Sequence, residues 1–122
     1  MGVRVLIAED EANIVESLTF ILGREGFDVS TVTDGEAALR SLRHDAPDLL
    51  ILDVMMPRLN GFEVLKKIRA DALLQRLPVI VLTAKTQARD RETAIAVGAD
   101  AYMTKPYSNR EVVEQVRRLT GG

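Results

Sequence analysis

Two alternating periodicities limit what this chain can fold into. Short apolar runs, such as Leu49–Leu52 and Val79–Leu82, are separated by longer stretches in which apolar residues recur every three or four positions. The short runs are typical of buried strands and the longer stretches of amphipathic helices. Five strand–helix units of this kind predict an α/β fold built on a parallel sheet. The five helices are expected from Glu11 to Arg24, from near Asp34, from Asn60 to near Ala70, from near Gln87 to Val97 with Gly98 as the C-cap, and from Ser108.

The polarity of the strands predicts their order in the sheet. Strands covered on both faces are continuously apolar, whereas edge strands mix polar and apolar residues. The first, third and fourth strands are continuous, but the second, at 27–32, contains polar positions, and the fifth is short. With right-handed crossovers, this favours a flavodoxin-like, doubly wound sheet of order 2-1-3-4-5. The first and fifth helices would cover one face and the other three helices the opposite face.

Polar residues follow four of the predicted strands, at the point where each strand ends. Glu9 and Asp10 follow the first strand, Asp53 closes the third, Thr83 closes the fourth and Lys105 follows the fifth. The carboxyl ends of parallel strands open onto one crevice, so these side chains are expected to converge there. The switch point between the first and third strands would bring Asp10 and Asp53 together.

This set of side chains suits phosphate chemistry at a metal site. Three close carboxylates repel one another, and a cation is the simplest way to balance them. Oxygen ligands without His or Cys favour a hard ion such as Mg²⁺, with Asp10 and Asp53 as direct ligands and Glu9 beside the ion or acting through water. Asp53 is placed to attack phosphorus and form an acyl phosphate, while the metal and Lys105 offset charge on the phosphoryl oxygens. Thr83 would donate a hydrogen bond to the new phosphoryl group.

The same residues resemble the motifs of a response-regulator receiver domain. These motifs are Glu9-Asp10, Asp53 within Leu50–Pro57, Asn60-Gly61, Thr83-Ala84 and Lys105-Pro106. The resemblance spans essentially the whole chain, so residues 1–122 are expected to form one receiver domain. It implies that Asp53 accepts phosphate from a histidine kinase or a histidine phosphotransfer protein, in a two-component phosphorelay. Such a domain is a signalling domain that assists its own phosphorylation and dephosphorylation, and is not an enzyme.

Further residue roles follow from this resemblance alone. Glu9 and Asp10 would hold Mg²⁺, the backbone carbonyl of Met55 would be a further metal ligand, and the Lys105–Pro106 peptide bond would be cis. Tyr102 corresponds to the aromatic residue that turns inward as the threonine hydroxyl moves toward phosphate. Phosphorylation would then change the surface of the fourth helix, fifth strand and fifth helix, which would include Tyr102 and Tyr107 and bind an output protein.

Composition limits the partners and the compartment. A length of 122 residues suits a single domain, and a net charge of -2 gives no general attraction to nucleic acid or to an anionic membrane. The chain has no cysteine, which excludes thiol and disulfide chemistry. No segment resembles a signal peptide or a membrane span, so a cytoplasmic location is the default expectation.

Two other functional classes compete with the receiver interpretation. An aspartate-dependent phosphohydrolase of the haloacid type would resemble a nucleophile followed two residues later by an acid, where this chain has Met55. A flavodoxin-like cofactor binder would need a phosphate-cradling loop rich in Ser, Thr or Gly after the first strand, and here that loop is acidic. The receiver interpretation fits these positions better than either.

The sequence also bears on output and on signal lifetime. Receivers joined to winged-helix DNA-binding domains typically carry an aspartate where this chain has Ala101 and an arginine where it has Gln115. Together with the end of the chain soon after the fifth helix, this favours a stand-alone receiver, with a fragment of a DNA-binding response regulator as the alternative. Met55 and Lys85 flank the path of an attacking water, and neither is suited to orient it, so slow self-dephosphorylation is expected.

Overall fold

The computed structural model describes residues 2–84 and 88–122, in which strands and helices alternate. The strands are β1 (Arg4–Ala8), β2 (Asp28–Val32), β3 (Leu49–Asp53), β4 (Val79–Ala84) and β5 (Ala101–Lys105). The helices are α1 (Ala12–Arg24), α2 (Gly35–His44), α3 (Gly61–Ala70), α4 (Ala88–Val97) and α5 (Asn109–Thr120). None of the helices within the described residues has the length and apolar character needed to span a bilayer.

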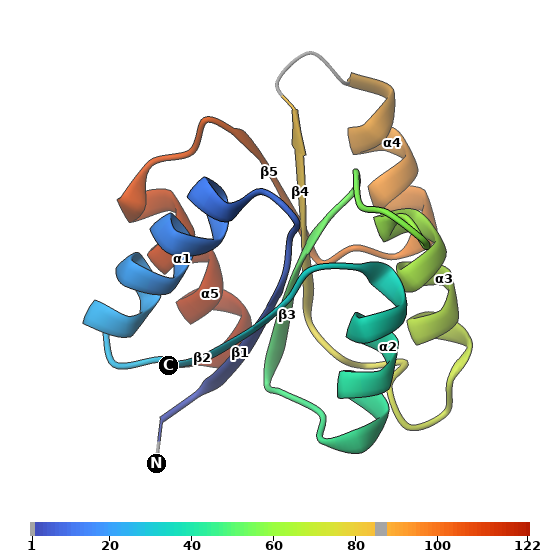
Figure 1. Ribbon diagram of the computed structural model, residues 1–122, viewed down its shortest axis with the longest axis horizontal. Helices are drawn as coiled ribbons and strands as arrows, with labels where there is room; N and C mark the ends of the chain where they lie inside the picture. The colour runs from blue at the N-terminus through green and yellow to red at the C-terminus, as the bar shows by residue number, and fades with distance from the viewer. Residues whose placement is uncertain (1, 85–87) are drawn as a thin grey trace.

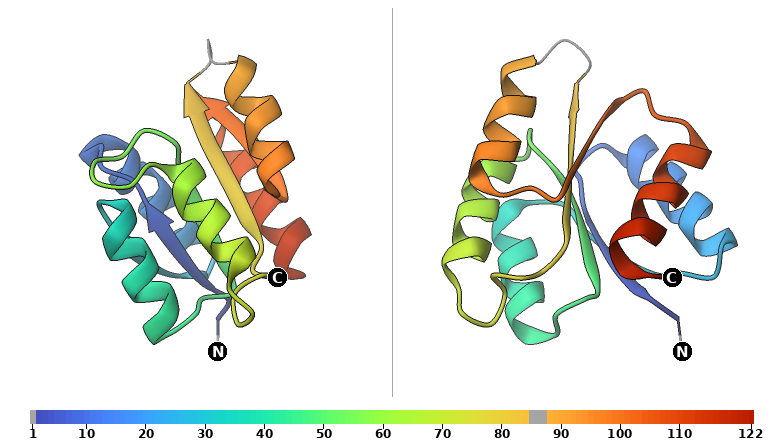
Figure 2. Two further views of the ribbon diagram at one scale, coloured as in Figure 1. Left: turned by 90° about the vertical axis from the view of Figure 1, so that its right-hand side faces the viewer. Right: turned by 180° about the vertical axis from the view of Figure 1, so that it is seen from behind.

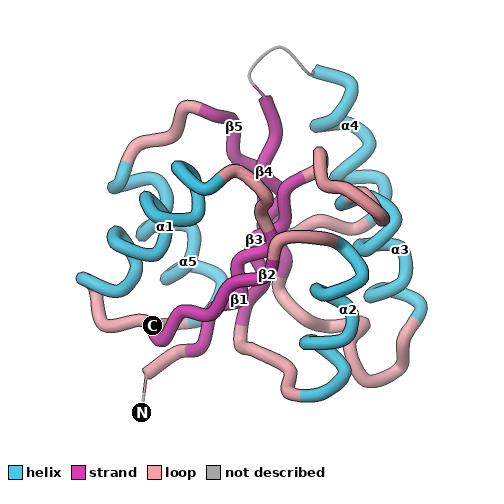
Figure 3. Tube along the Cα trace, viewed as in Figure 1, coloured by secondary structure: helices cyan, strands magenta, loops and turns pink. Residues whose placement is uncertain are grey.

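All five strands are parallel and form one sheet in the order β2-β1-β3-β4-β5 (Figures 1 and 3). The predicted order is therefore confirmed. β3 is buried along its whole length, whereas β2 at one edge is exposed or half-buried at every position. In the register of the sheet, Asp53 lies opposite Leu82, and Ala84 lies opposite Lys105. The strands therefore end at nearly the same level, which brings their last residues to one edge.

Two helical layers cover the sheet, with α1 and α5 on one face and α2, α3 and α4 on the other (Figure 2). Alternation along β3 divides its side chains between two cores: Ile51 packs with the α1–α5 layer, and Leu50 and Leu52 pack with the α2–α4 layer. Each fully buried side chain of this size contributes about 1.5–3 kcal/mol. The continuous apolar runs that identified the central strands in the sequence are thus explained by burial on both faces.

Side-chain caps fix the helix starts that the sequence predicts. The Asn60 side chain accepts a hydrogen bond from the Glu63 amide, and Glu63 accepts one from the Asn60 amide, which makes a capping box at the start of α3. Asp34 and Ser108 cap α2 and α5 in the same way, through one hydrogen bond each. Glu11 has an extended conformation and is the N-cap residue, so α1 begins one residue later than expected. Gln87, the expected start of the fourth helix, lies outside the described residues.

Gly61 sets the distance between α3 and the end of β3. A Cβ atom at this position would clash with the carbonyl oxygen of Asp53 and would lie 2.9 Å from the Cα of Val54. The Gly61 amide donates a hydrogen bond to the Val54 carbonyl at 3.0 Å. Glycine is therefore required here for close approach of two backbones, and this approach fixes the first turn of α3 beside Asp53.

Candidate functional site

The polar residues that the sequence places at strand ends meet at one edge of the sheet. Glu9 follows β1, Asp53 and Thr83 lie on β3 and β4, and Lys105 is the last residue of β5. Glu9, Asp53 and Thr83 are buried, with exposed fractions of 0%, 2% and 1%, although all three are polar. Burial of three polar side chains in one place needs compensation by hydrogen bonds, ion pairs or a bound ion.

Lys105 provides part of this compensation through three carboxylates. Its Nζ lies 3.1 Å from Oε1 of Glu9 and 3.4 Å from Oδ1 of Asp53. It also donates a hydrogen bond to Oε1 of Glu11 at 3.2 Å. Burial acts to lower the pKa of Lys105, but the charges of Asp53 and Glu9 outweigh burial and raise it. Lys105 is therefore a fixed positive charge at this site.

One lysine does not balance the buried carboxylates. Burial, reinforced by Asp53, raises the pKa of Glu9 to about 7. Burial also raises the pKa of Asp53, against the opposing effects of Glu9, Lys105 and the Met55 amide. In both side chains the charged form is less favourable than it would be in water, because the single positive charge of Lys105 does not offset burial of two carboxylates.

Asp53 has one oxygen in contact with the protein and one without a hydrogen-bond partner. Oδ1 accepts a long hydrogen bond from the Met55 amide at 3.4 Å and faces Lys105. Oδ2 is buried and has no hydrogen-bond partner among the described residues. A buried acceptor without a partner is costly, so this oxygen is suited to an incoming cation or phosphorus atom.

Asp10 completes a group of three acidic side chains that fits a metal ion. One carboxylate oxygen from each of Glu9, Asp10 and Asp53 lies within 4.8 Å of the other two. Asp10 is exposed, so the group opens to solvent on its side. An all-oxygen donor set of this kind, with an open face for water or phosphate oxygens, fits Mg²⁺.

Thr83 and the Lys105–Pro106 peptide bond lie at the carboxyl ends of β4 and β5, and Met55 follows the end of β3 by two residues. Among the described residues, the Thr83 hydroxyl makes one contact, of 3.5 Å with the Ala84 carbonyl, which is at the limit of a hydrogen bond and leaves the hydroxyl suited to bind another acceptor. The Lys105–Pro106 peptide bond is cis, as the resemblance implied. Met55 lies two residues beyond Asp53, and its side chain is 72% exposed. Lys85 lies outside the described residues.

The two tyrosines lie on different sides of the sheet. Tyr102 is half-buried against the core beneath α2, α3 and α4, and Tyr107 is half-buried against the core beneath α1 and α5. Burial raises the pKa of Tyr107. Tyr102 thus packs on the α4 side of β5 and Tyr107 on the α5 side, and their membership of one switch surface stays a prediction.

Glu11 is a site residue that sequence reasoning missed. The sequence suggests a charged start of the first helix, and the residue is indeed its N-cap. The structure adds that its carboxylate contacts Lys105, and that its amide donates a hydrogen bond to Oε2 of Glu9 at 3.1 Å. A third consecutive acidic residue after the first strand was the available signal.

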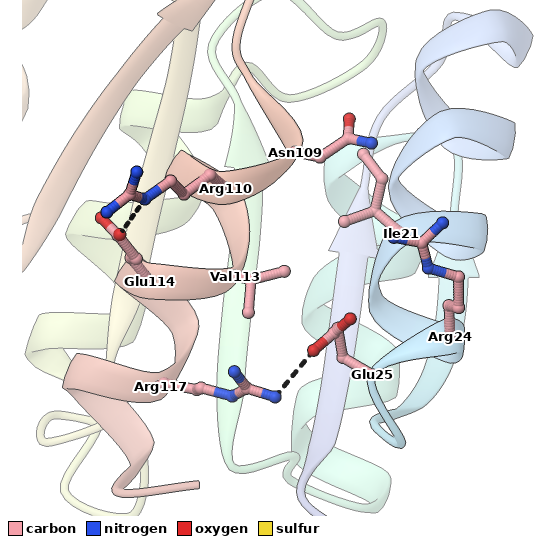
Figure 4. A pocket seen from close by; sticks show the side chains of 8 residues that line it. All are labelled: Ile21, Arg24, Glu25, Asn109, Arg110, Val113, Glu114 and Arg117. Atoms are coloured by element: carbon pink, nitrogen blue, oxygen red, sulfur yellow. Dashed lines mark hydrogen bonds and ion pairs between the residues drawn. The ribbon is translucent and has the colours of Figure 1, made fainter.

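A separate hollow of about 410 Å³ lies between α1 and α5 (Figure 4). Ile21 and Val113 form its apolar part, and an ion pair of 2.8 Å between Arg117 and Glu25 bridges the two helices. None of the predicted site residues lines it. The hollow is therefore distinct from the carboxylate group.

Comparisons with known proteins agree with this geometry. A family model described as a response regulator receiver domain matches residues 5–117. The chain is 44% identical over 119 residues to the alkaline phosphatase synthesis transcriptional regulatory protein PhoP of Bacillus subtilis, covering 98% of this chain and 49% of that protein. It is 41% identical over 117 residues to the DNA-binding response regulator MtrA of Mycobacterium tuberculosis, covering 96% and 50%. The chain thus spans about half the length of these relatives.

One solved structure allows the site itself to be compared. The receiver domain of the sensor histidine kinase PA1611 from Pseudomonas aeruginosa superposes with a TM-score of 0.92 at 30% identity, and the match covers 100% of both chains. That structure has a magnesium ion coordinated in its active site cleft.

Proposed function

The chain belongs to the response regulator receiver family, and on this premise we propose that Asp53 accepts a phosphoryl group in a Mg²⁺-dependent reaction. The donor would be the phosphohistidine of a histidine kinase or of a histidine phosphotransfer protein, in the cytoplasm. The observation that carries the proposal is the Asp53 carboxylate: its buried Oδ2 lacks a hydrogen-bond partner among the described residues, and its Oδ1 lies 3.4 Å from Nζ of Lys105. Carboxylate oxygens of Glu9 and Asp10 lie within 4.8 Å of one of its oxygens. Family membership favours this function over a phosphohydrolase or a flavin binder.

In the proposed reaction, a carboxylate oxygen of Asp53 attacks phosphorus. A new O–P bond forms as the P–N bond of the donor breaks, and the electron pair of that bond leaves with the imidazole. Lys105 is already 3.4 Å from Asp53 and would turn toward the phosphoryl oxygens, which carry more negative charge than the carboxylate that it contacts at rest. The Thr83 hydroxyl would exchange its long contact with Ala84 for a hydrogen bond to the phosphoryl group.

The acidic group would hold the metal. Asp10 and Asp53 would bind Mg²⁺ directly, Glu9 would bind it directly or through water, and the backbone carbonyl of Met55 would be a further ligand by family resemblance. When bound, the ion would neutralise charge on the transferring phosphoryl oxygens. The raised pKa values of Glu9 and Asp53 support this assignment, because a divalent ion is the charge that the two buried carboxylates lack.

The output would be a change at the surface of α4, β5 and α5. Thr83 is the penultimate residue of β4, and Tyr102 lies on the neighbouring strand, where Val81 is its partner in register. Movement of the Thr83 hydroxyl toward phosphate would open space for the tyrosine ring, and the altered surface would bind an output protein. Phosphorylation would favour one of two conformers simply because Thr83 and Tyr102 make different contacts in each.

A second candidate concerns the form of the output. MtrA is a DNA-binding response regulator, and this chain matches about half of it. The same receiver would then control a DNA-binding domain in a longer regulator. Ala101 and Gln115 argue against the dimer that such regulators form through ion pairs at these positions, and favour a partner protein instead. Sedimentation of the chain with and without beryllofluoride separates the two: activation-dependent dimers support the second candidate, and persistent monomers support the first.

The decisive experiment is phosphoryl incorporation from phosphoramidate, followed by intact-protein mass spectrometry. The wild type should gain one phosphoryl group with Mg²⁺ and almost none when the metal is chelated. Asp53→Asn should gain none. Asp45→Asn is the matched control, because this aspartate is exposed and pairs with Arg4, not with Lys105; it should be labelled like the wild type. Equal labelling of Asp53→Asn and the wild type would refute the proposal.

A further inference from the structure

An arginine on α4 lies over the ring of Tyr102. The guanidinium carbon of Arg91 is 5.7 Å from the ring centroid, which is within cation–π distance. Arg91 makes no ion pair among the described residues that would draw the guanidinium elsewhere. The aromatic ring is therefore the main partner that the structure gives to this side chain.

The ring and the arginine border a hollow of about 230 Å³ between α4, β5 and α5. A second arginine, Arg118, also lines the hollow, but Gln115 accepts hydrogen bonds from it at 2.7 and 3.1 Å. Asp100, the acidic residue of the hollow, is held by Arg69 and by the Val79 amide. Of the charged groups that line the hollow, Arg91 is thus the one that contacts the Tyr102 ring.

α4 is lightly anchored in comparison with the other helices. Among its residues with described side chains, only Ala94 is fully buried, whereas α1, α2 and α3 each bury larger apolar side chains. Loss of an alanine contact costs little when a helix shifts. A contact between Arg91 and Tyr102 therefore accounts for a larger share of the attachment of α4 to β5 than a single surface contact normally would.

We propose that Arg91 is a positioning residue that holds the Tyr102 ring at rest and opposes its movement on phosphorylation. This inference rests on the proposed function of Asp53. Its consequence is regulatory: the strength of the contact sets how much phosphoryl signal is needed before Tyr102 changes position.

The test uses the two tyrosines of the chain as ¹⁹F NMR probes. The intact chain is prepared with 3-fluorotyrosine, and the Tyr102 resonance is assigned by the loss of the other signal in Tyr107→Phe. Beryllofluoride with Mg²⁺ serves as the phosphoryl mimic. The variants are Arg91→Ala, Arg91→Lys and Arg89→Ala, the last being an exposed arginine on the same helix with no aromatic contact among the described residues.

Arg91→Ala should move the resting Tyr102 resonance toward its activated position. It should also lower the beryllofluoride concentration at half-conversion by about two- to fivefold, as expected for loss of one exposed cation–π contact. Arg91→Lys, which keeps a cation, should restore most of the wild-type behaviour, and Arg89→Ala should match the wild type. The proposal is overturned if Arg91→Ala leaves both the resonance and the midpoint unchanged, or if Arg89→Ala has the same effect.

A different result is expected if the proposed phosphoryl acceptance by Asp53 is itself wrong. In that case beryllofluoride and Mg²⁺ would leave the Tyr102 resonance and the backbone amides around Asp53 unchanged in the wild type, and the regulatory role of Arg91 would fall with it. A wild type that responds around Asp53, together with an Arg91→Ala variant that behaves identically, would refute the role of Arg91 alone.

Discussion

The backbone of Gly61 lies against the carbonyl oxygen of Asp53 so closely that no side chain fits between them. The end of β3 at Asp53 and the first turn of α3 are therefore one rigid unit. The Asn60–Glu63 capping box holds this turn from the other side.

Gly61→Ala should lower the free energy of unfolding by about 1–3 kcal/mol, because the new methyl group forces the two backbones apart. Gly23→Ala is the matched control, since a Cβ at that α1 position meets nothing within 4 Å. It should raise stability by about 0.5–1 kcal/mol. Urea denaturation measures both changes; equal effects of the two substitutions would contradict the close-approach argument.

Asp10→Asn should weaken Mg²⁺ binding by tenfold or more, given that removal of even an outer-shell partner of a metal typically costs about 10–100-fold. Isothermal titration calorimetry measures the affinity directly. Glu16→Gln removes an exposed carboxylate on α1 outside the acidic group and should bind the ion like the wild type. Unchanged affinity in Asp10→Asn would remove this residue from the ligand set.

Stability should depend on pH through Glu9. Its pKa is raised from 4.5 to about 7 in the folded protein, so the folded state holds a proton that the unfolded state has already lost in this range. In chelator, the Glu9 contribution to stability is fully present below pH 4.5 and is lost as the pH rises through about 7. Asp53 has the same sign.

The measurement compares the wild type with Glu9→Gln by denaturation across pH 4.5 to 8. In chelator, the difference between them should shift against the wild type as the pH rises, and saturating Mg²⁺ should reverse that shift by favouring the charged carboxylates. A difference that is flat with pH in both conditions would show that Glu9 titrates normally.

Arg69 should matter far more for stability than an exposed arginine. Its guanidinium donates hydrogen bonds to the carbonyls of Gly98, Gln75 and Leu77 and to Asp100, and thereby joins α3 to two loops at the end of the sheet opposite the site. Arg69→Ala should cost about 2–4 kcal/mol, because several carbonyls lose their donor. Arg110→Ala, which breaks a solvent-exposed pair with Glu114, should cost far less, because water and salt screen that pair.

Met55→Asn should speed loss of the phosphoryl group. An amide two residues beyond Asp53 can orient water for in-line attack, whereas the thioether of an exposed methionine cannot. The decay of the phosphorylated species, followed by mass spectrometry after removal of the donor, measures the rate. Leu73→Asn controls for an exposed apolar residue changed to asparagine far from the site in sequence, and should decay at the wild-type rate. Slower or unchanged decay in Met55→Asn would refute the prediction.

Strand order, the convergence of strand ends and several helix caps could be predicted from local sequence patterns. The apolar run Leu49–Leu52 indicates a strand buried on both faces, and the mixed polarity of 27–32 indicates an edge strand. With right-handed crossovers, these two patterns favour the order that the sheet has. Because parallel strands all end at one side, Asp10 and Asp53 could be placed together without any knowledge of distance. Caps at Asp34, Asn60 and Ser108 were visible as residue types.

Features that depend on side-chain reach were not predictable. Lys105 contacts Glu11 across 94 positions of sequence, and nothing in either local segment specifies that partner. Tyr102 and Tyr107 pack against cores on opposite faces of the sheet, and nothing in the local sequence around either residue specifies its core. The contact between Arg91 and Tyr102 likewise depends on how α4 sits on the sheet.

Lys105 and Tyr102 are both residues of β5, three positions apart. At roughly 3.3 Å per residue, the lysine that contacts Asp53 and the ring that contacts Arg91 are separated by about 10 Å of a single strand. An odd spacing also sends their side chains toward opposite faces of the sheet. Under the proposed function, a signal would therefore pass from one face of the sheet to the other along one short segment of a single strand, without a relay of loops.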